Sequence, residues 1–308
     1  MEVLAAATTI YLFSVTLHLP AGATSPLNYS DINYIWHREG LGAHPHRVPY
    51  LEYRLEYPPI IGLLIWAASS LGELGAYHLV MAGLQYPFVV LAVVSLHLIC
   101  RLEGRDSSLI LTQFVLTLSM AWFAYYCWDI VAIGFMTSSL YFWLAKRPKI
   151  SSLLLGLGAS AKLIPFVLLP VLMQDAKHWR QRLELAAVST ATFLGFNLPI
   201  MIYDFEAWRW IYVHTALWVN EDSYWLMIFG PYERFFSRIG FLLLFLLLLC
   251  LVLASRVDIL HKCSAAMASF LSTTYIYPPQ FLLFLLPFQA LAPLMSGPLL
   301  RILDLANV

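Results

Sequence analysis

The sequence predicts an all-α polytopic membrane protein, and three observations carry this prediction. Of the 308 residues, 60% are hydrophobic and 12% are charged, whereas soluble domains carry about 25% charged residues. The mean hydropathy is +0.73, and long apolar runs contain no Asp, Glu, Lys or Arg. Because no polar stretch is long enough to bury a core of its own, residues 1–308 are expected to form one integral membrane domain.

Charge and cysteine content narrow the function classes. The formal net charge is zero, which argues against a nucleic-acid partner. The four cysteines lie in or at the ends of apolar runs without a paired spacing, so neither a zinc site nor a disulfide framework is indicated. The first apolar run lacks a basic start and a small-residue cleavage site, so we expect it to be retained as a membrane span.

Ten charge-free runs are candidate membrane helices. They are Val3–Leu19, Tyr57–Gly72, Gly75–Cys100, Ser107–Trp128, Ile130–Ala145, Ile150–Ala161, Leu163–Gln174, Leu185–Tyr203, Ile239–Ser255 and Cys263–Leu300. A spanning helix needs about 20 residues, so Ile150–Ala161 and Leu163–Gln174 are each too short to cross alone. Cys263–Leu300 is long enough for a hairpin that turns at Tyr277-Pro278-Pro279.

Basic residues give the orientation of these runs. They cluster at Arg101 and Arg105, at Lys146, Arg147 and Lys149, at Lys177, Arg180 and Arg182, at Arg256 and Lys262, and at Arg301. The positive-inside rule places such clusters in the cytoplasm. Ser107–Trp128 and Ile130–Ala145 then form a hairpin, and the segment 204–238 lies outside.

Two stretches do not fit simple crossings. Residues 150–174 must go out and return, which they can do only as two half-length helices broken near Lys162 and Pro165. Such breaks are tolerated where they line a protein-walled cavity. The chain must also cross an odd number of times between the first loop, residues 20–56, and Arg101. Tyr57–Gly72 is therefore expected to be partial, tilted or re-entrant.

With this orientation the unusual polar residues gather on the extracytoplasmic face, where we expect an active site. They are Asp31, Glu56, Asp129, Lys162, His214, Glu221, Asp222 and the turn Tyr277-Pro278-Pro279. A carboxylate at the edge of a membrane span is costly unless it has a function or a partner, so Asp31 is the strongest candidate. The segment 204–238 is rich in Trp and Tyr, which suit the membrane interface and, for one or two of them, the apolar face of a sugar ring.

The motifs of this face resemble those of a known family. Tyr29-Ser30-Asp31-Ile32, Pro49-Tyr50 and Glu56-Tyr57-Pro58-Pro59 resemble the first external loop of lipid-linked-sugar glycosyltransferases of the C fold. Later motifs are similar in the same order: Trp128-Asp129-Ile130, Gly156-Leu157-Gly158 through Lys162-Leu163-Ile164-Pro165, and Tyr277-Pro278-Pro279-Gln280-Phe281 with Pro287. The chain is most similar to glycosyltransferase family 87, the polyprenyl-phosphate-mannose-dependent mannosyltransferases, and also resembles the catalytic subunit of GPI mannosyltransferase I.

The resemblance implies a C-type glycosyltransferase fold with about 9–11 transmembrane or half-membrane helices and a large first extracytoplasmic loop. It implies transfer of a hexose, by resemblance mannose, from a polyprenyl (dolichyl) phosphate to a hydroxyl of a lipid-linked or glycan acceptor, with inversion. The sequence departs from the pattern at Ile164, where Tyr is usual, and at Asp31-Ile32-Asn33, where one carboxylate of an acidic pair remains. This counts against a two-carboxylate metal site, so we expect no metal and no other cofactor, with a divalent metal as the alternative.

Transfer needs one base to take the acceptor proton, and Asp31 is the candidate. A low-dielectric boundary can raise the pKa of such a carboxyl toward a useful value. The alternatives are a helix cap or an ion pair with Arg38 or Arg54. Glu56 is a candidate to bind an acceptor hydroxyl or to hold an arginine. Arg38, Arg47 and Arg54 are candidate ligands of the donor phosphate, with solvated loop charges as the alternative.

Lys162 is the sharper phosphate candidate, because a cation between two apolar half-helices is costly and the leaving polyprenyl phosphate is an anion. The alternative is a buried ion pair with Asp129. His214 could donate to the phosphate or the sugar, or be an interfacial residue. Tyr57 and Gln280 complete the expected substrate-binding set.

Two other function classes stay open: a lipid or sugar transporter, and a non-catalytic membrane subunit of a glycosylation complex. A transporter commonly has broken helices in corresponding halves, whereas this sequence indicates one break and gathers its polar residues at one face. The expected partners are the polyprenyl-phosphate-sugar donor, a glycolipid or glycan acceptor, membrane lipids and, as an option, an accessory membrane subunit. The expected location is the cell membrane or the endoplasmic reticulum.

Overall fold

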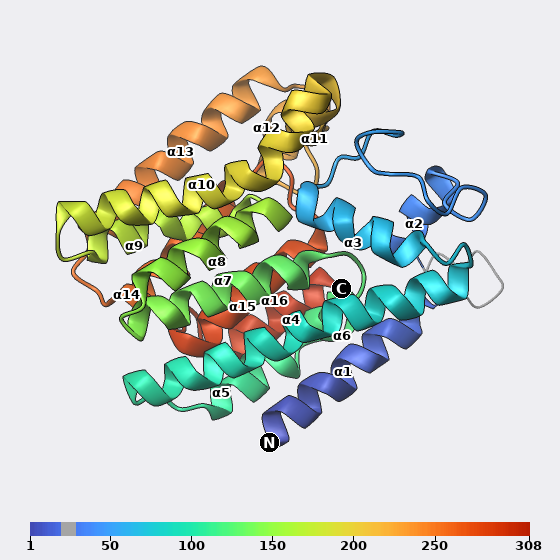
Figure 1. Cartoon of the computed structure of the whole chain (residues 1–308). Helices are drawn as coiled ribbons and strands as arrows, with labels where there is room; N and C mark the ends of the chain where they lie inside the picture. The colour runs from blue at the N-terminus through green and yellow to red at the C-terminus, as the bar shows by residue number, and fades with distance from the viewer. Residues whose placement is uncertain (20–28) are drawn as a thin grey trace.

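The computed structural model describes residues 1–19 and 29–308, and this part of the chain is all-helical. It forms no strand beyond two isolated bridges, Pro49 with Tyr53 and Glu221 with Ile276. Most helices run from lower left to upper right in Figure 1. The prediction of an all-α protein is confirmed. Residues 20–28, which begin the expected first loop, lie outside the described residues.

The elements follow one another as α-helices with a few short irregular turns. They are α1 (Glu2–His18), α2 (Asp31–Arg38), α3 (Pro59–Ser69), α4 (Leu74–Glu103), α5 (Ser108–Ile110), the π-helical turn η2 (Leu111–Val115), α6 (Leu118–Phe123), α7 (Asp129–Leu144), α8 (Pro148–Ala161), the 3-10 turn η3 (Ile164–Leu168), α9 (Leu169–Asp175), α10 (Trp179–Tyr203), α11 (Phe205–Leu217), α12 (Tyr224–Phe229), α13 (Phe235–Ala254), α14 (Ile259–Thr273), the 3-10 turn η4 (Pro279–Phe281), α15 (Leu282–Leu291) and α16 (Gly297–Asn307).

Three helices of the described residues, α4, α10 and α13, are long and apolar enough to cross a membrane. The outer surface of α13 exposes large apolar side chains such as Leu243, at 63%, and Leu251, at 59%. Exposure of this kind is costly in water and normal for a helix that faces lipid. These features fit an integral membrane protein.

Helix α3 is shorter than a membrane span. It has 11 residues and begins directly after Pro58, so it rises only about 16 Å and is too short to cross a bilayer. Gly72 then turns the chain with a φ of 70°, and α4 starts at Leu74. In Figure 1, α3 stays at the end of the bundle that holds α2. The expectation that residues 57–72 form only a partial helix is confirmed.

The predicted break near Lys162 is also confirmed. Helix α8 ends at Ala161, Lys162 is extended with φ −161° and ψ 140°, and η3 resumes the helical path two residues later. Helix α8 packs closely on α10 because Gly156 has no side chain; a Cβ there would lie 2.6 Å from Thr192 Cβ. The break therefore sits on a rigid two-helix support.

The prediction that Ser107–Trp128 forms one continuous span is wrong. This run is divided into α5, η2 and α6. A new helix can begin at Leu118 because the freed backbone N–H groups find partners. Thr117 caps α6 by accepting from Met120 N at 3.1 Å. Asp304 accepts from Leu118 N at 2.6 Å and from Ser119 N at 2.8 Å.

The last apolar run forms the expected hairpin and then returns. Helix α14 and helix α15 are joined through the turn at η4. Helix α16 then leads back toward that turn, since Asn307 Nδ2 donates to Pro279 O at 2.8 Å. Arg301 therefore lies within a returning helix, and not in a basic loop as the sequence suggested.

Candidate active site

Asp31 lies in the first turn of α2, where local hydrogen bonds hold it. Ser30 caps the helix by accepting from Asn33 N at 3.1 Å, and Asp31 N donates to Tyr126 O at 3.0 Å. The carboxylate accepts from the Tyr57 phenol, 2.8 Å from Oδ2. A longer contact of 3.3 Å joins the Tyr29 phenol to Oδ1. Asp31 therefore neither caps α2 nor pairs with an arginine, and Oδ1 is its less engaged atom.

The surroundings of Asp31 change its proton affinity. Burial raises the pKa of the half-buried carboxyl to about 6, from an ordinary value of 3.8. The hydrogen bond from Tyr57 and the positive charge of Lys162 lower this pKa, and the negative charge of Asp129 adds to the increase. Packing also connects these groups, because the Tyr57 ring that donates to Asp31 lies with its centre 4.6 Å from that of Trp128, the residue before Asp129.

Lys162 and Asp129 form an ion pair at the broken helix. Lys162 Nζ donates to Asp129 Oδ1, and the side chains are 24% and 4% exposed. Among the described residues Asp129 Oδ2 is buried without a hydrogen-bond partner. The ammonium also lies 4.4 Å from the centre of the Phe281 ring. Because an ammonium carries three N–H groups, Lys162 can hold Asp129 and still bind an anion.

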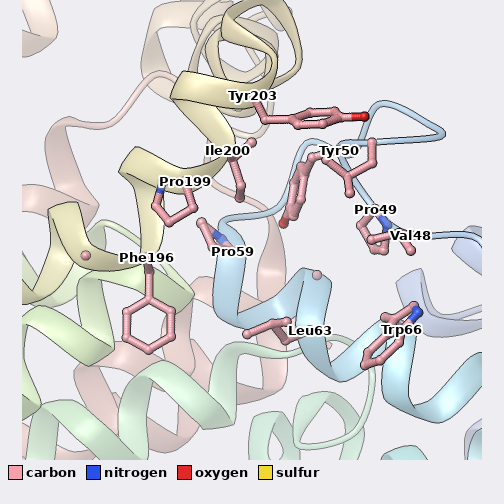
Figure 2. Close-up of a pocket in the computed structure, with 13 residues that line it drawn as sticks. Val48, Pro49, Tyr50, Pro59, Leu63, Trp66, Phe196, Pro199, Ile200 and Tyr203 are labelled. Atoms are coloured by element: carbon pink, nitrogen blue, oxygen red, sulfur yellow. The ribbon is translucent and has the colours of Figure 1, made fainter.

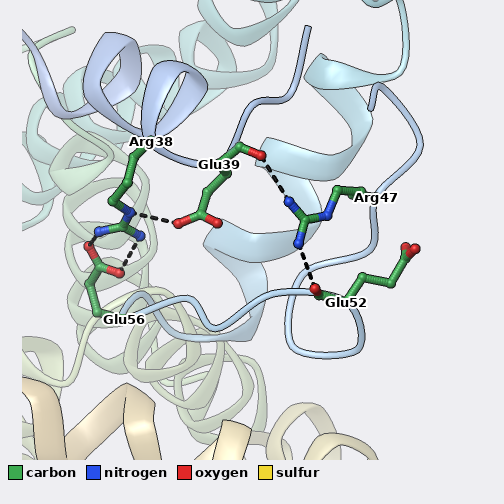
Figure 3. A network of polar contacts seen from close by, with 5 residues as sticks. All are labelled: Arg38, Glu39, Arg47, Glu52 and Glu56. Atoms are coloured by element: carbon green, nitrogen blue, oxygen red, sulfur yellow. Dashed lines mark hydrogen bonds and ion pairs between the residues drawn. The ribbon is translucent and has the colours of Figure 1, made fainter. Parts of the chain in front are cut away.

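A second charged group joins α2 to the loop before α3, as Figure 3 shows. Arg38 donates to both carboxylate oxygens of Glu56, at 2.6 and 2.7 Å, and to Glu39 at 2.6 Å. Arg47 donates to the backbone oxygens of Glu39 and Glu52, at 3.0 and 2.6 Å. Glu56 thus holds an arginine, and both arginines support the loop. A role for Arg38 as a phosphate ligand stays a prediction.

Helix α11 brings His214 and Trp210 to the loop that carries Arg54. Burial lowers the pKa of His214, while Glu56 raises it and Arg38 lowers it further, so the imidazole lies near the Arg38–Glu56 pair. Arg54 lies over the Trp210 ring, with its Cζ 5.9 Å from the ring centre. His214 and Trp210 therefore face the loop from α11, and Arg54 contacts α11 from the loop.

The turn before α15 closes the site on another side. Glu221 and Tyr277 are joined by a backbone hydrogen bond of 2.9 Å from Tyr277 N to Glu221 O. Gln280 is 9% exposed and precedes Phe281, whose ring contacts the Lys162 ammonium. The turn thereby packs the Phe281 ring against Lys162. Gln280 is the residue directly before Phe281.

One cavity has an almost entirely apolar lining, and Figure 2 shows the residues that line it. Its volume is about 560 Å³. The loop before α3, α3 itself and α10 line it, with the residues Val48, Pro49, Tyr50, Leu51, Pro59, Gly62, Leu63, Trp66, Gly195, Phe196, Pro199, Ile200 and Tyr203. Tyr50 links it to the carboxylate, because its phenol donates to Tyr57 O at 2.7 Å and the Tyr57 phenol donates to Asp31.

The predicted residues thus form two adjoining groups. One contains Asp31, Tyr57, Asp129 and Lys162, with Gln280 at its edge; the other contains Arg38, Glu56 and His214, with Arg54 at its edge. The structure adds three aromatic residues that sequence reasoning did not assign. They are Tyr29, Tyr126 and Phe281. Tyr29 and Phe281 belong to the motifs quoted above, and Tyr126 lies two residues before Trp128, so their place in or near a motif was the only signal available.

Within the described residues no group of three or more His, Cys, Asp or Glu side chains is placed to hold a metal ion. At the broken helix Asp129 is paired with Lys162, which supplies a positive charge there. That the protein uses no metal stays a prediction. A scan against known protein families gives no match, and a search of the curated proteins gives none either.

Proposed function

We propose that this protein is an integral membrane glycosyltransferase that moves a hexose from a polyprenyl phosphate to a hydroxyl acceptor. The observation that carries the proposal is the Asp31 carboxylate, which is half-buried, held by two phenols and has a pKa of about 6. A general base is most effective when its pKa lies near the operating pH. The resemblance of the surrounding motifs supports mannose as the sugar.

The reaction assigned to the site is a single displacement. The acceptor oxygen forms a bond to the anomeric carbon while the bond from that carbon to the phosphate oxygen breaks. The acceptor proton passes to Asp31, at the less engaged Oδ1. The electron pair leaves with the polyprenyl phosphate, whose charge Lys162 stabilises. Attack opposite to the leaving group inverts the configuration.

The apolar cavity supports a lipid-linked donor. It adjoins α10, one of the three candidate spans, and a polyprenyl chain needs an apolar surface near the membrane. Two hydrogen bonds, through Tyr50 and Tyr57, connect the lining of this cavity to Asp31. In this proposal the polyprenyl chain occupies the cavity, and the phosphate and the sugar lie at Lys162 and Asp31.

The test is transfer by the purified protein in liposomes that contain polyprenyl-phosphate mannose or polyprenyl-phosphate glucose, with extracted membrane lipids as acceptors. Mass spectrometry identifies the product, and NMR determines its anomeric configuration. We expect a new glycolipid with inverted configuration. A product with retained configuration would contradict the single displacement. Absence of product from either donor, together with movement of the donor across the bilayer, would favour a transporter.

A further inference from the structure

Three rings follow one another in a row at the end of helix α11: Trp210 and His214 lie on the helix, and Trp218 is the residue directly after its last turn. A spacing of four residues places side chains on one helix face. The ring centres of Trp210 and His214 are 4.9 Å apart, and those of His214 and Trp218 are 5.1 Å apart. The rings are tilted by 56° and 52°. Because they are not stacked flat, no ring covers the face of the next.

This row faces the charged loop and not the neighbouring helix. Trp208 and Tyr212 lie on a different face of α11, and both donate to the side-chain oxygen of Asn197 on α10. They fix the helix in place. The charges of Glu56 and Arg38, in contrast, change the pKa of His214. A ring that only anchors a helix in the membrane interface would face lipid, so anchoring does not account for this orientation.

Charged groups lie at both ends of the row. The Arg54 guanidinium lies over Trp210, and Glu221 accepts from Trp218 Nε1 at 2.7 Å. The backbone oxygen of Glu221 accepts from Tyr277 N at 2.9 Å, in the turn that leads to Phe281 beside Lys162. The row therefore runs from Arg54 in the loop to Glu221, which is joined to the turn at the candidate active site.

Aromatic faces with polar groups at their edges are what a carbohydrate needs. The C–H face of a pyranose is apolar and weakly positive, and it packs on the negative face of an aromatic ring. The hydroxyl groups around the sugar ring need donors and acceptors such as Arg54 and Glu221. The His214 ring separates the two indoles, with ring-centre distances of 4.9 and 5.1 Å, so each indole can hold a sugar ring of its own.

We propose that Trp210, His214 and Trp218 form a carbohydrate-binding surface that holds the acceptor, so that the acceptor is a glycan or a glycolipid with more than one sugar residue. The identification of the bound sugar as the acceptor rests on the proposed function. The binding of a sugar rests only on the arrangement of the three rings. The sugar rings stack on the two indoles, and the terminal hydroxyl reaches Asp31.

Binding is tested first, without the donor. Saturation-transfer NMR on the purified protein in nanodiscs uses mannotriose, maltotriose and chitotriose as probes. We expect the wild-type protein to bind at least one of them. Trp210→Ala should weaken this binding by about tenfold, whereas Trp210→Tyr should retain most of it. Tyr232→Ala is the matched control, because this ring belongs to the same outer segment, is 78% exposed and lies outside the row.

The Trp218 end has its own variant. Trp218→Ala removes the indole and also its hydrogen bond to Glu221. Glu221→Gln is therefore measured as well, because it removes the charge and keeps an oxygen that can accept from the indole. Circular dichroism checks the fold of each variant. Binding of no probe by the wild-type protein, or equal binding by wild type, Trp210→Ala and Glu221→Gln, would overturn the proposal and leave the rings as interfacial anchors.

Steady-state kinetics separate this proposal from the proposed function. With a glycolipid acceptor, Trp210→Ala should raise the KM for the acceptor and change kcat and the KM for the donor little. Transfer with an unchanged acceptor KM would refute the surface and leave the transferase intact. Tryptophan-dependent sugar binding without transfer from any donor would refute the transferase and leave a carbohydrate-binding surface.

Discussion

Replacing Asp31 by Asn should stabilise the protein while it abolishes transfer. The folded-state pKa of about 6 and the ordinary value of 3.8 differ by about 2 units, which correspond to about 3 kcal/mol. Partial exposure of the side chain reduces this to about 1–3 kcal/mol. Asn keeps an oxygen that can accept from Tyr57, so the change removes the buried charge and leaves the hydrogen bond.

The pH dependence makes this prediction specific. Below about pH 4 the carboxyl is protonated in the folded and the unfolded state, and Asp31 and Asn should be equally stable. As pH rises to about 6 the unfolded state loses the proton first, so the wild-type protein loses stability relative to the variant. Above the folded pKa the difference stays constant.

Thermal unfolding of the purified proteins in detergent, followed by circular dichroism from pH 4 to pH 8, measures this difference. The variant should unfold several degrees above wild type at pH 7.5 and at the same temperature near pH 4. Tyr57→Phe should act in the opposite sense, because loss of this donor raises the pKa of Asp31 further. A variant Asp31→Asn that is less stable than wild type at pH 7.5 would refute the reasoning.

Three further predictions follow from the contacts of the site. Lys162→Met leaves Asp129 buried without its partner and should lower the free energy of unfolding by about 3–5 kcal/mol. The double variant Lys162→Met/Asp129→Asn should recover most of this stability in chemical unfolding but should not recover transfer. A double variant that is no more stable than the single one would contradict this. Gly62→Ala places a Cβ 2.7 Å from Tyr50 Cζ, so it should cost about 1–3 kcal/mol and raise the KM for the donor, whereas Gly83→Ala, which meets no atom within 4 Å, should change neither. The acidic limb of kcat/KM should lie near pH 6, because the general base must be ionised; a rate that stays level down to about pH 4 would contradict its assignment.

Features that depend on local sequence were predictable. A lysine and a proline inside one apolar stretch indicated the break between α8 and η3, because neither residue suits a continuous membrane helix. The ion pair of Lys162 with Asp129 was expected as an alternative to phosphate contact, and the structure contains it. Both inferences followed from the cost of burying a charge and from the expected position of Asp129 and Lys162 on the same face of the membrane.

Features that depend on distant partners were not predictable. The start of α6 at Leu118 is stabilised by Asp304, which lies on α16. The hydropathy of the Ser107–Trp128 run does not indicate that a new helix begins there. The hydrogen bond from the Asp31 amide to Tyr126 O could not be predicted either, nor could the contact between Phe281 and Lys162. Each contact joins segments whose proximity arises only when the helices have packed.

The central claim is that Asp31 is the base of a glycosyl transfer, and one comparison tests it most directly. Transfer of labelled mannose from polyprenyl-phosphate mannose is measured in liposomes with EDTA present, for wild type, Asp31→Asn and Asp222→Asn. Asp222 is an exposed carboxylate with a φ of 46°, a conformation that Asn tolerates, so it is the matched control. We predict that wild type and Asp222→Asn transfer label at similar rates and that Asp31→Asn is slower by about 10²–10⁴-fold. Equal rates for all three proteins would contradict the claim.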